Sequence, residues 1–235
     1  MASTERLLRE GLELTEIQRQ LILGTLLGDG HIRVPDNGSH PLIKIAHSVK
    51  QKEYVVWKYD HLSSLCRMKP YEGTSELNDR TYGNCYFSTR SLPCLDEIYK
   101  LTVIDNKKTV TKSWVDAITH PIALAAWFMD DGTINQQKKK SGNSCTTDMR
   151  FALGNASDSE CNTLSKFLND VWDIPTKLCK LPPTKHGKYE GRIYSELRIT
   201  RTENLMRFKD LIQPYIIPSM SYKTRLYRKN LQYPN

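Results

Sequence analysis

Two apolar segments, Ile22–Gly30 (ILGTLLGDG) and Leu124–Gly132 (LAAWFMDDG), share one pattern. Each is an apolar run that contains small residues and ends in an acid followed by glycine. A helix that is apolar on nearly all sides is either buried or packed against a similar helix. Gly24 in the first segment, and Ala123 with Ala126 around the second, leave room for two backbones to approach closely. We therefore predict two buried helices that pack against each other.

Residues typical of helix ends mark both segments. Thr15 and Gln18 fit a capping box before the first helix, and Pro121 suits the first turn of the second. Gly30 and Gly132 follow the apolar runs, as glycine commonly does where a helix ends. The predicted helices therefore stop close to the two acid-glycine pairs.

Strand-like alternation of apolar and polar positions follows each predicted helix, and the same order of elements occurs twice. In the first half we predict a hairpin of 31–34 and 42–47 around 35–41, then a helix over 51–65, and a strand pair ending in 82–90. In the second half we predict a hairpin of 133–138 and 149–155, then a helix over 158–171, and a strand pair ending in 192–200. A short helix closes each half. This alternation predicts an α+β fold, with halves 1–112 and 113–235.

The repeated acids, Asp29 and Asp131, lie 102 positions apart, about one small domain length. An Asp-Gly pair alone is usually a turn, but its repetition after matching helices favours a shared site. Paired helices would bring both carboxylates together at helix C-termini, where the helix dipole and their mutual repulsion disfavour negative charge. Divalent cations would offset this repulsion.

Composition narrows the class of protein. The 235 residues carry a net charge of +8 and 39% hydrophobic residues, with a pI near 9.1. This charge favours a polyanionic partner without demonstrating one. The six cysteines form no close pairs of metal-ligand spacing, which favours reduced thiols over disulfides or zinc. We see no signal peptide and no apolar run of membrane length, and we expect an intracellular protein.

The two segments and the stretches that follow them resemble the LAGLIDADG homing endonucleases, in the single-chain form with two motifs. This resemblance implies two αββαββα units related by a pseudo-twofold axis, with antiparallel, saddle-shaped DNA-binding sheets and a central two-helix interface. It also implies that Asp29 and Asp131 bind catalytic metals with the backbone carbonyls of Gly28 and Asp130. The chain departs from the motif at Leu27, which replaces its first acid, and at Asp130, where a small residue is usual.

A second repeat concerns lysines. Apolar stretches that end in Lys-Thr close both halves and make Lys108 and Lys223 equivalent; without the family context a surface lysine is an equal alternative. The resemblance implies that these lysines lie beside the metals, where they orient the attacking water or stabilise charge on the phosphate. His47 and Asn155, each before the helix that follows a hairpin, are assigned to matching polar positions around that water, with a possible slip of one or two residues.

Polar side chains at alternate positions of the strands are candidates for DNA contacts, since a two-stranded ribbon fits the major groove. A sheet that simply faces solvent is the alternative. The predicted contacts of the first half are Arg33, Lys44, Tyr82, Asn84, Tyr86, Ser88 and Arg90, and those of the second are Lys138, Arg150, Arg192, Tyr194, Glu196 and Arg198. Ile193, Leu197 and Ile199 are predicted on the opposite, packed face. The basic segment Tyr222–Asn235 is either a phosphate-binding tail or a solvated end.

These patterns and the resemblance predict a site-specific endonuclease that hydrolyses both strands of a long, asymmetric double-stranded DNA target and promotes mobility of its host intron or intein. The expected cofactor is Mg²⁺, with Mn²⁺ or Ca²⁺ as substitutes and Ca²⁺ non-catalytic. A monomer suffices, no membrane is involved, and host intron RNA is a further possible partner. A mitochondrion, a chloroplast and a bacterial cytoplasm all suit such a protein. The alternatives are an RNA-splicing maturase and a non-catalytic DNA-binding regulator on the same scaffold.

Overall fold

The computed structural model describes residues 11–77, 80–138, 144–184 and 190–226, which divide into two compact units. The first contains the described residues up to Thr109 with Ile118–Trp127 and Ile217–Ser219; the second contains Val110–Ala117, Phe128–Ile216 and the described residues from Met220 onward. The predicted halves, 1–112 and 113–235, refer to the repeated sequence and stay a prediction.

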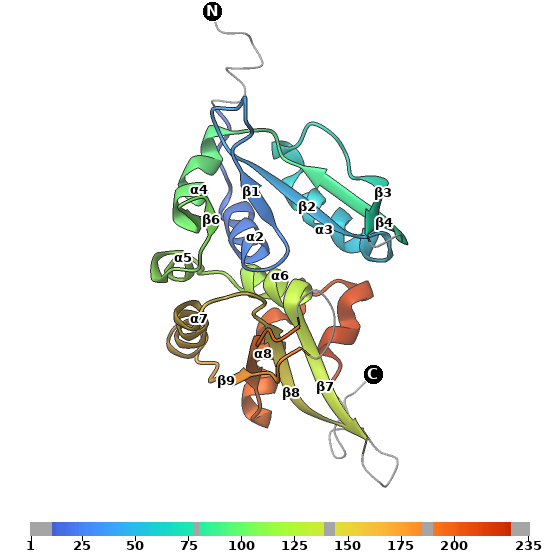
Figure 1. Ribbon diagram of the computed structural model, residues 1–235, viewed down its shortest axis with the longest axis vertical. Helices are drawn as coiled ribbons and strands as arrows, with labels where there is room; N and C mark the ends of the chain where they lie inside the picture. Colours follow the sequence, from blue (N-terminus) through green and yellow to red (C-terminus); the bar gives the residue numbers. More distant parts are fainter. Residues whose placement is uncertain (1–10, 78–79, 139–143, 185–189, 227–235) are drawn as a thin grey trace, which may run out of the picture. The chain divides into compact units, whose positions relative to one another are not determined.

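The first unit contains one antiparallel sheet of four strands covered by helices. Its elements are α2 (Glu16–Leu27), β1 (His31–Arg33), β2 (Leu42–Ser48), α3 (Lys52–Leu62), β3 (Tyr71–Leu77), β4 (Arg80–Ser88), α4 (Asp96–Thr102), β5 (Val103–Ile104) and β6 (Lys107–Lys108). The strand order is β1-β2-β4-β3, and β5 and β6 form a separate small hairpin. Figure 1 shows α3 behind the strands β2 and β4, which it contacts.

The second unit repeats this plan. Its elements are α5 (Lys112–Asp116), the last residues of α6 (Pro121–Asp131), β7 (Gly132–Lys138), β8 (Ser144–Ala152), α7 (Asp158–Asp170), β9 (Lys177–Lys180), β10 (Ser195–Ile199) and α8 (Thr202–Ile212). The strand order β7-β8-β10-β9 corresponds strand for strand to that of the first sheet. The first copy of the repeat thus runs from α2 to α4, and the second from α6 to α8. Both have the predicted αββαββα order, which is confirmed.

Helix α2 begins and packs as its sequence predicts. Thr15 and Gln18 form the capping box, with the Gln18 amide N–H donating to Thr15 Oγ1 at 3.2 Å. Residues 20–26 are buried. A Cβ atom added to Gly24 would lie 2.1 Å from the Ala123 carbonyl oxygen of α6, closer than atoms can pack. Only glycine therefore permits this approach of the two backbones, which confirms the predicted close packing.

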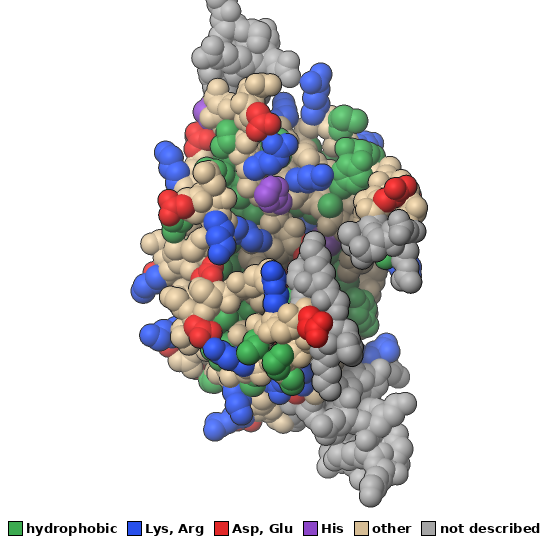
Figure 2. Space-filling view, viewed as in Figure 1, with side chains coloured by type: hydrophobic (Ala, Val, Ile, Leu, Met, Phe, Trp, Pro, Cys, Tyr) green, Lys and Arg blue, Asp and Glu red, His purple; other side chains and the backbone are tan. Residues whose placement is uncertain are grey.

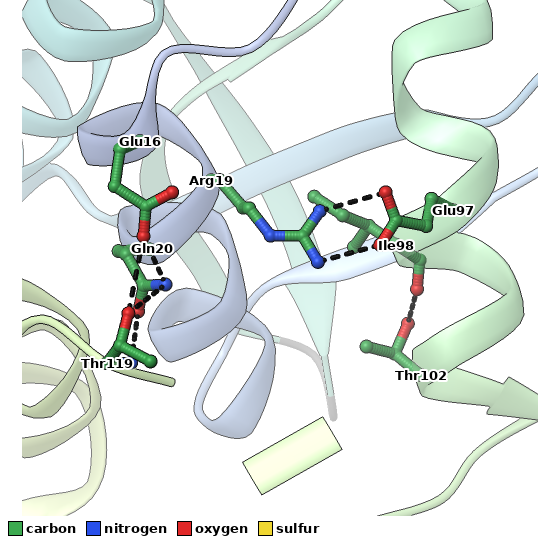
Figure 3. A network of polar contacts seen from close by, with 7 residues as sticks. All are labelled: Glu16, Arg19, Gln20, Glu97, Ile98, Thr102 and Thr119. Atoms are coloured by element: carbon green, nitrogen blue, oxygen red, sulfur yellow. Dashed lines mark hydrogen bonds and ion pairs between the residues drawn. The ribbon is translucent and has the colours of Figure 1, made fainter. Parts of the chain in front are cut away.

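Polar contacts fix the N-terminal part of α2 within the first unit (Figure 3). The Gln20 side chain accepts a hydrogen bond from the Thr119 backbone N–H at 2.9 Å, just before α6 begins. On the other side of the helix, Arg19 donates to both carboxylate oxygens of Glu97 in α4, at 3.1 and 2.8 Å. This ion pair lowers the pKa of Glu97, chiefly through the hydrogen bond from Arg19.

Three aromatic side chains form the centre of the second unit. Phe128 of α6, Phe151 of β8 and Phe208 of α8 are fully buried, and their rings meet edge to face with centroids 5.2 to 5.5 Å apart. This geometry is favourable for aromatic rings. It ties the end of the second apolar helix to the sheet and to the closing helix.

Three predicted strands have clearly different ends in the structure. The strand predicted at 82–90 is β4 (Arg80–Ser88), the one predicted at 149–155 is β8 (Ser144–Ala152), and the one predicted at 192–200 is β10 (Ser195–Ile199). Because β10 starts after Ile193, that side chain does not pack on the buried face as predicted and is 57% exposed. The described parts of the chain contain no helix long and apolar enough to cross a membrane.

Candidate active site

Asp29 lies in the turn directly after α2, and its side chain is 53% exposed. The Gly30 N–H donates to the Thr25 carbonyl at 2.8 Å, which closes the helix and fixes the turn. The carboxylate is therefore at the C-terminal end of a buried helix, where exposed carbonyl groups already give a negative potential. Asp131 is the last residue of α6 and occupies the matching position in the second unit.

Lys108 supplies positive charge at the end of α2. Its Nζ donates to the carbonyl oxygens of Gly28 at 2.8 Å and Gly30 at 3.3 Å. The lysine is carried by the β5–β6 hairpin, whose turn residues Asp105 and Asn106 have φ angles of 50° and 60°. Asp and Asn tolerate this left-handed conformation better than most residues. A tight turn thus brings a lysine from far along the chain beside the first motif acid.

Lys223 makes the corresponding contacts in the second unit. Its Nζ donates to the carbonyl oxygens of Met129 at 2.5 Å and Asp130 at 3.2 Å. It comes from the 3₁₀ segment Pro218–Thr224 and is buried, whereas Lys108 is exposed. Each motif helix therefore ends at a lysine of its own unit, which neutralises part of the negative potential at the helix terminus.

The predicted metal-ligand carbonyls, those of Gly28 and Asp130, are the ones that accept these lysine hydrogen bonds. A carbonyl oxygen has two lone pairs, so each group can accept one further contact. Metal binding by them stays a prediction.

His47 of β2 connects Asp29 to the interior of the first unit. Its Nδ1 lies 3.6 Å from the Asp29 carboxylate, and its side chain is 4% exposed. On the other side of the ring, Nε2 lies 3.3 Å from Nζ of Lys58 in α3. Lys58 is fully buried and stands 4.3 Å over the ring of Tyr54. Sequence reasoning missed Lys58, although a lysine amid the buried positions 54, 55 and 62 of α3 was a signal.

The prediction that His47 and Asn155 are equivalent is wrong, because the strand register assigns His47 a different counterpart. Lys44 pairs with Ser88 in the first sheet, and Arg150 pairs with Arg198 at the same place in the second. Counting three residues onward from each makes Leu153 the counterpart of His47. Asn155 lies two residues further, is exposed, and accepts a hydrogen bond from Arg192 at 3.4 Å. The longer second hairpin produced the slip.

The first sheet presents a largely uncharged polar face. The pairs Ala46–Tyr86 and Ser48–Asn84 of β2 and β4 confirm that the predicted residues Tyr82, Asn84, Tyr86 and Ser88 share one face with Lys44. The pairing of β3 with β4 adds Tyr71 and Ser75 to this face. Both residues were absent from the predicted contacts, because no bounds were predicted for the strand that pairs with 82–90. Asn84 donates to Ser75 Oγ at 2.7 Å, and a hydrogen bond with Tyr71 raises the pKa of Tyr86.

The second sheet instead carries an ion-pair cluster on the corresponding face. Arg150 and Arg198 are direct cross-strand partners, an arrangement of like charges that is unfavourable by itself. Asp148 and Glu196, only 6% and 7% exposed, bind these arginines. The hydrogen bond to Asp148 is the main cause of the raised pKa of Arg150. The predicted DNA contacts Arg150, Glu196 and Arg198 therefore engage one another.

The remaining predicted DNA contacts are exposed strand residues or lie just outside the strands. Arg33 and Lys44 are exposed on β1 and β2, and Tyr194 precedes β10. Arg90 lies beyond the end of β4 and donates to the Ser64 carbonyl at 2.8 Å, so it joins the strand to the end of α3. The side chain of Lys138, and residues 227–235 of the predicted basic tail, lie outside the described part of the structure.

The thiols fit the expectation of reduced cysteines. Five cysteines within the described side chains are free, and Cys85 and Cys161 among them are buried. Burial raises the pKa of the Cys66 thiol to about 12. The Cys66 thiol is therefore protonated at neutral pH and is a poor nucleophile or metal ligand.

Known proteins resemble this chain over most of its length. The RecA protein of Mycolicibacterium flavescens is 27% identical over 219 residues, which cover 89% of this chain and 47% of that relative, so the chain spans about half its length. DNA endonuclease I-ChuI of Chlamydomonas applanata is 26% identical over 223 residues, 90% of this chain and 96% of that protein.

Among solved structures, the homing endonuclease I-WcaI bound to its DNA recognition sequence superposes with a TM-score of 0.77 at 21% identity, covering 92% of this chain and 89% of the other. This likeness shows a shared fold. A model of the LAGLIDADG DNA endonuclease family matches residues 19–196, and that stretch contains both acid-glycine motifs and most of both sheets. The chain therefore belongs to the LAGLIDADG DNA endonuclease family.

Proposed function

We propose that this protein is a metal-dependent endonuclease that hydrolyses both strands of a long, asymmetric DNA target. One observation carries the proposal: an aspartate follows each motif helix, and a lysine distant in sequence binds the carbonyl that precedes it, in both units. A purely structural aspartate turn has no need of a cation brought from 79 or 92 positions further along the chain.

The residues at the helix ends suit a divalent cation. Mg²⁺ prefers oxygen ligands and keeps several of its waters, and Asp29 offers a half-exposed carboxylate where negative charge is otherwise unfavourable. Asp29 and Asp131 would hold the metal, with Gly28 and Asp130 as further oxygen donors. When bound, Mg²⁺ supplies an acidified water and neutralises charge on the phosphodiester oxygens. Mn²⁺ is a proposed substitute, and Ca²⁺ a non-catalytic one.

The side chains of this chain supply the remaining functions. Lys108 and Lys223 would stabilise negative charge that develops on the phosphate, since each ammonium group binds the carbonyl that precedes a motif acid. His47 would orient the attacking water near Asp29. The sheet faces would read DNA, with amide, hydroxyl and aromatic groups suited to base edges and phosphates. Figure 2 shows basic and acidic side chains interspersed on the face in view.

We further propose that the enzyme acts as a monomer and promotes mobility of a host intron or intein. The two units differ at most predicted contact positions, which favours an asymmetric target over a palindrome. The proposed setting is an organelle or a bacterial cytoplasm.

The decisive experiment uses a duplex made by joining the sequences that flank the gene's host element. Wild type is expected to cut both strands with Mg²⁺, while Asp29→Asn and Asp131→Asn bind the duplex but lose at least about 100-fold in cleavage rate, the scale of electrostatic groups in active sites. Matched Asp210→Asn, on the exposed side of α8, should cut normally. Binding by wild type without metal-dependent scission would contradict the proposal and favour a DNA-binding regulator.

A further inference from the structure

Lys58 is a charged side chain in a place that normally holds an apolar one. It is 0% exposed, in the middle of the buried stripe of α3. Lysine is almost never fully buried without partners, because removing an ammonium group from water is costly. Here Nζ lies 3.3 Å from His47 Nε2 and 4.3 Å over the Tyr54 ring. The fold thus places a buried lysine directly beside His47.

The two ring nitrogens of His47 face different partners. Nε2 lies 3.3 Å from Nζ of Lys58, and Nδ1 lies 3.6 Å from the Asp29 carboxylate. A lysine ammonium group can only donate hydrogen bonds, so with Lys58 charged the ring proton would reside on Nδ1, toward Asp29. Tyr54 packs against the same imidazole with ring centroids 5.0 Å apart. Its hydroxyl donates to the Ala126 carbonyl of α6 at 3.0 Å, which holds the support in place.

The second unit has no such device at the corresponding positions. The register that pairs His47 with Leu153 also relates α3 to α7, whose buried positions Cys161, Leu164 and Leu168 follow Val55, Lys58 and Leu62 by the same 106 positions. Leu164 thus stands in place of Lys58, and both leucines are buried. An aliphatic pair therefore fills the corresponding place in the second unit.

We propose that Lys58 is a positioning residue that acts through His47 on the half-site of Asp29 alone, and that the two half-sites cut their strands by unequal means. The proposal rests on the proposed endonuclease function. Lys58 holds the His47 ring with its N–H toward Asp29, so that the imidazole orients the carboxylate and the water near it. Such supporting contacts around a metal-binding group typically change activity by 10–100-fold.

The test resolves cleavage by strand. The full-length protein and a duplex labelled differently on its two strands are used with Mg²⁺, and each strand's single-turnover rate is measured. Lys58→Met is expected to slow one strand by about 10-fold or more and to accumulate nicked duplex. Lys108→Met, which acts at the same helix end, should slow the same strand, and Lys223→Met the other. Lys58→Arg should restore part of the lost rate.

A double-mutant cycle separates positioning from folding. If Lys58 acts through His47, then Lys58→Leu has little further effect in a His47→Leu background, which reproduces the aliphatic pair of the second unit. Leu62→Ala, a buried substitution on the same helix, should lower stability without changing the ratio of strand rates. Equal slowing of both strands by Lys58→Met would overturn the inference. Absence of cleavage by wild type would instead overturn the endonuclease proposal.

Discussion

The two units share their backbone plan but not the chemistry of their buried and exposed faces. Both have the αββαββα order, the same strand order, and a lysine bound to carbonyls at the end of the motif helix. They differ beneath the sheet, where Leu153 and Leu164 of the second unit correspond to His47 and Lys58 of the first. They also differ on the polar face of the sheet. There, hydroxyl and amide groups of the first sheet correspond to an ion-pair cluster in the second. The motif ends are thus more constrained than the surfaces around them.

This difference indicates which features are tied to backbone geometry. Carbonyl oxygens are exposed wherever a helix ends, and in both units a lysine distant in sequence binds them. Side chains on a sheet face or inside a hydrophobic layer can change without moving the backbone, provided that volume and hydrogen bonding are preserved.

The largest expected effect concerns the contact between α2 and α6, where α2 has Gly24 and α6 has Ala126 at the matching position. Gly24→Ala places a methyl carbon 2.1 Å from the Ala123 carbonyl oxygen, so α2 and α6 must separate. We expect a loss of about 3 kcal/mol or more in the free energy of unfolding, at the upper end for overpacked cores, measured by urea denaturation. Ala126→Gly, at the matching position of α6, should cost only about 1–2 kcal/mol. Equal losses would show that the two positions are interchangeable.

The second prediction separates the two lysines. Lys223 is buried and Lys108 is exposed, although both bind helix-end carbonyls. Lys223→Met should destabilise the protein by about 1–3 kcal/mol, because buried carbonyls lose their donor, while Lys108→Met should cost less than about 1 kcal/mol because water can replace the ammonium group. Chemical denaturation curves of both variants provide the measurement. A larger loss of unfolding free energy for Lys108→Met than for Lys223→Met would mean that burial does not determine how much each lysine contributes to stability.

The smallest expected effect concerns the ion-pair cluster of the second sheet. Glu196→Gln removes the carboxylate that binds Arg150 and Arg198 and leaves an excess of positive charge on that face. DNA affinity should rise severalfold at low salt, with a steeper salt dependence, since freed arginines can bind phosphates. Fluorescence anisotropy over a salt series measures this. Asp210→Asn makes the same change in net charge away from the sheet, so an equal gain in both variants would exclude a local effect.

Much of the fold could be predicted from local patterns. The capping box at Thr15, Pro121 at the start of α6, and the apolar runs before Asp29 and Asp131 marked both motif helices, because these signals act within a few residues. Strand alternation similarly placed Tyr82 and Tyr86 on one face. The positions of Lys108 and Lys223 were predictable only because the sequence repeats, since nothing local links either lysine to its acid.

The sequence by itself determined the duplicated order of elements, the two acids at helix ends and the repeated lysines, since each depends on short-range periodicity or on internal repetition. Tertiary structure decided the rest. The pairing of β2 with β4 and of β8 with β10 fixed Leu153, not Asn155, as the counterpart of His47. Packing of α3 on its sheet brought Lys58 to His47, and cross-strand pairing set Glu196 between two arginines. These contacts join residues distant in sequence, and their register depends on hairpin lengths that alternation alone does not specify.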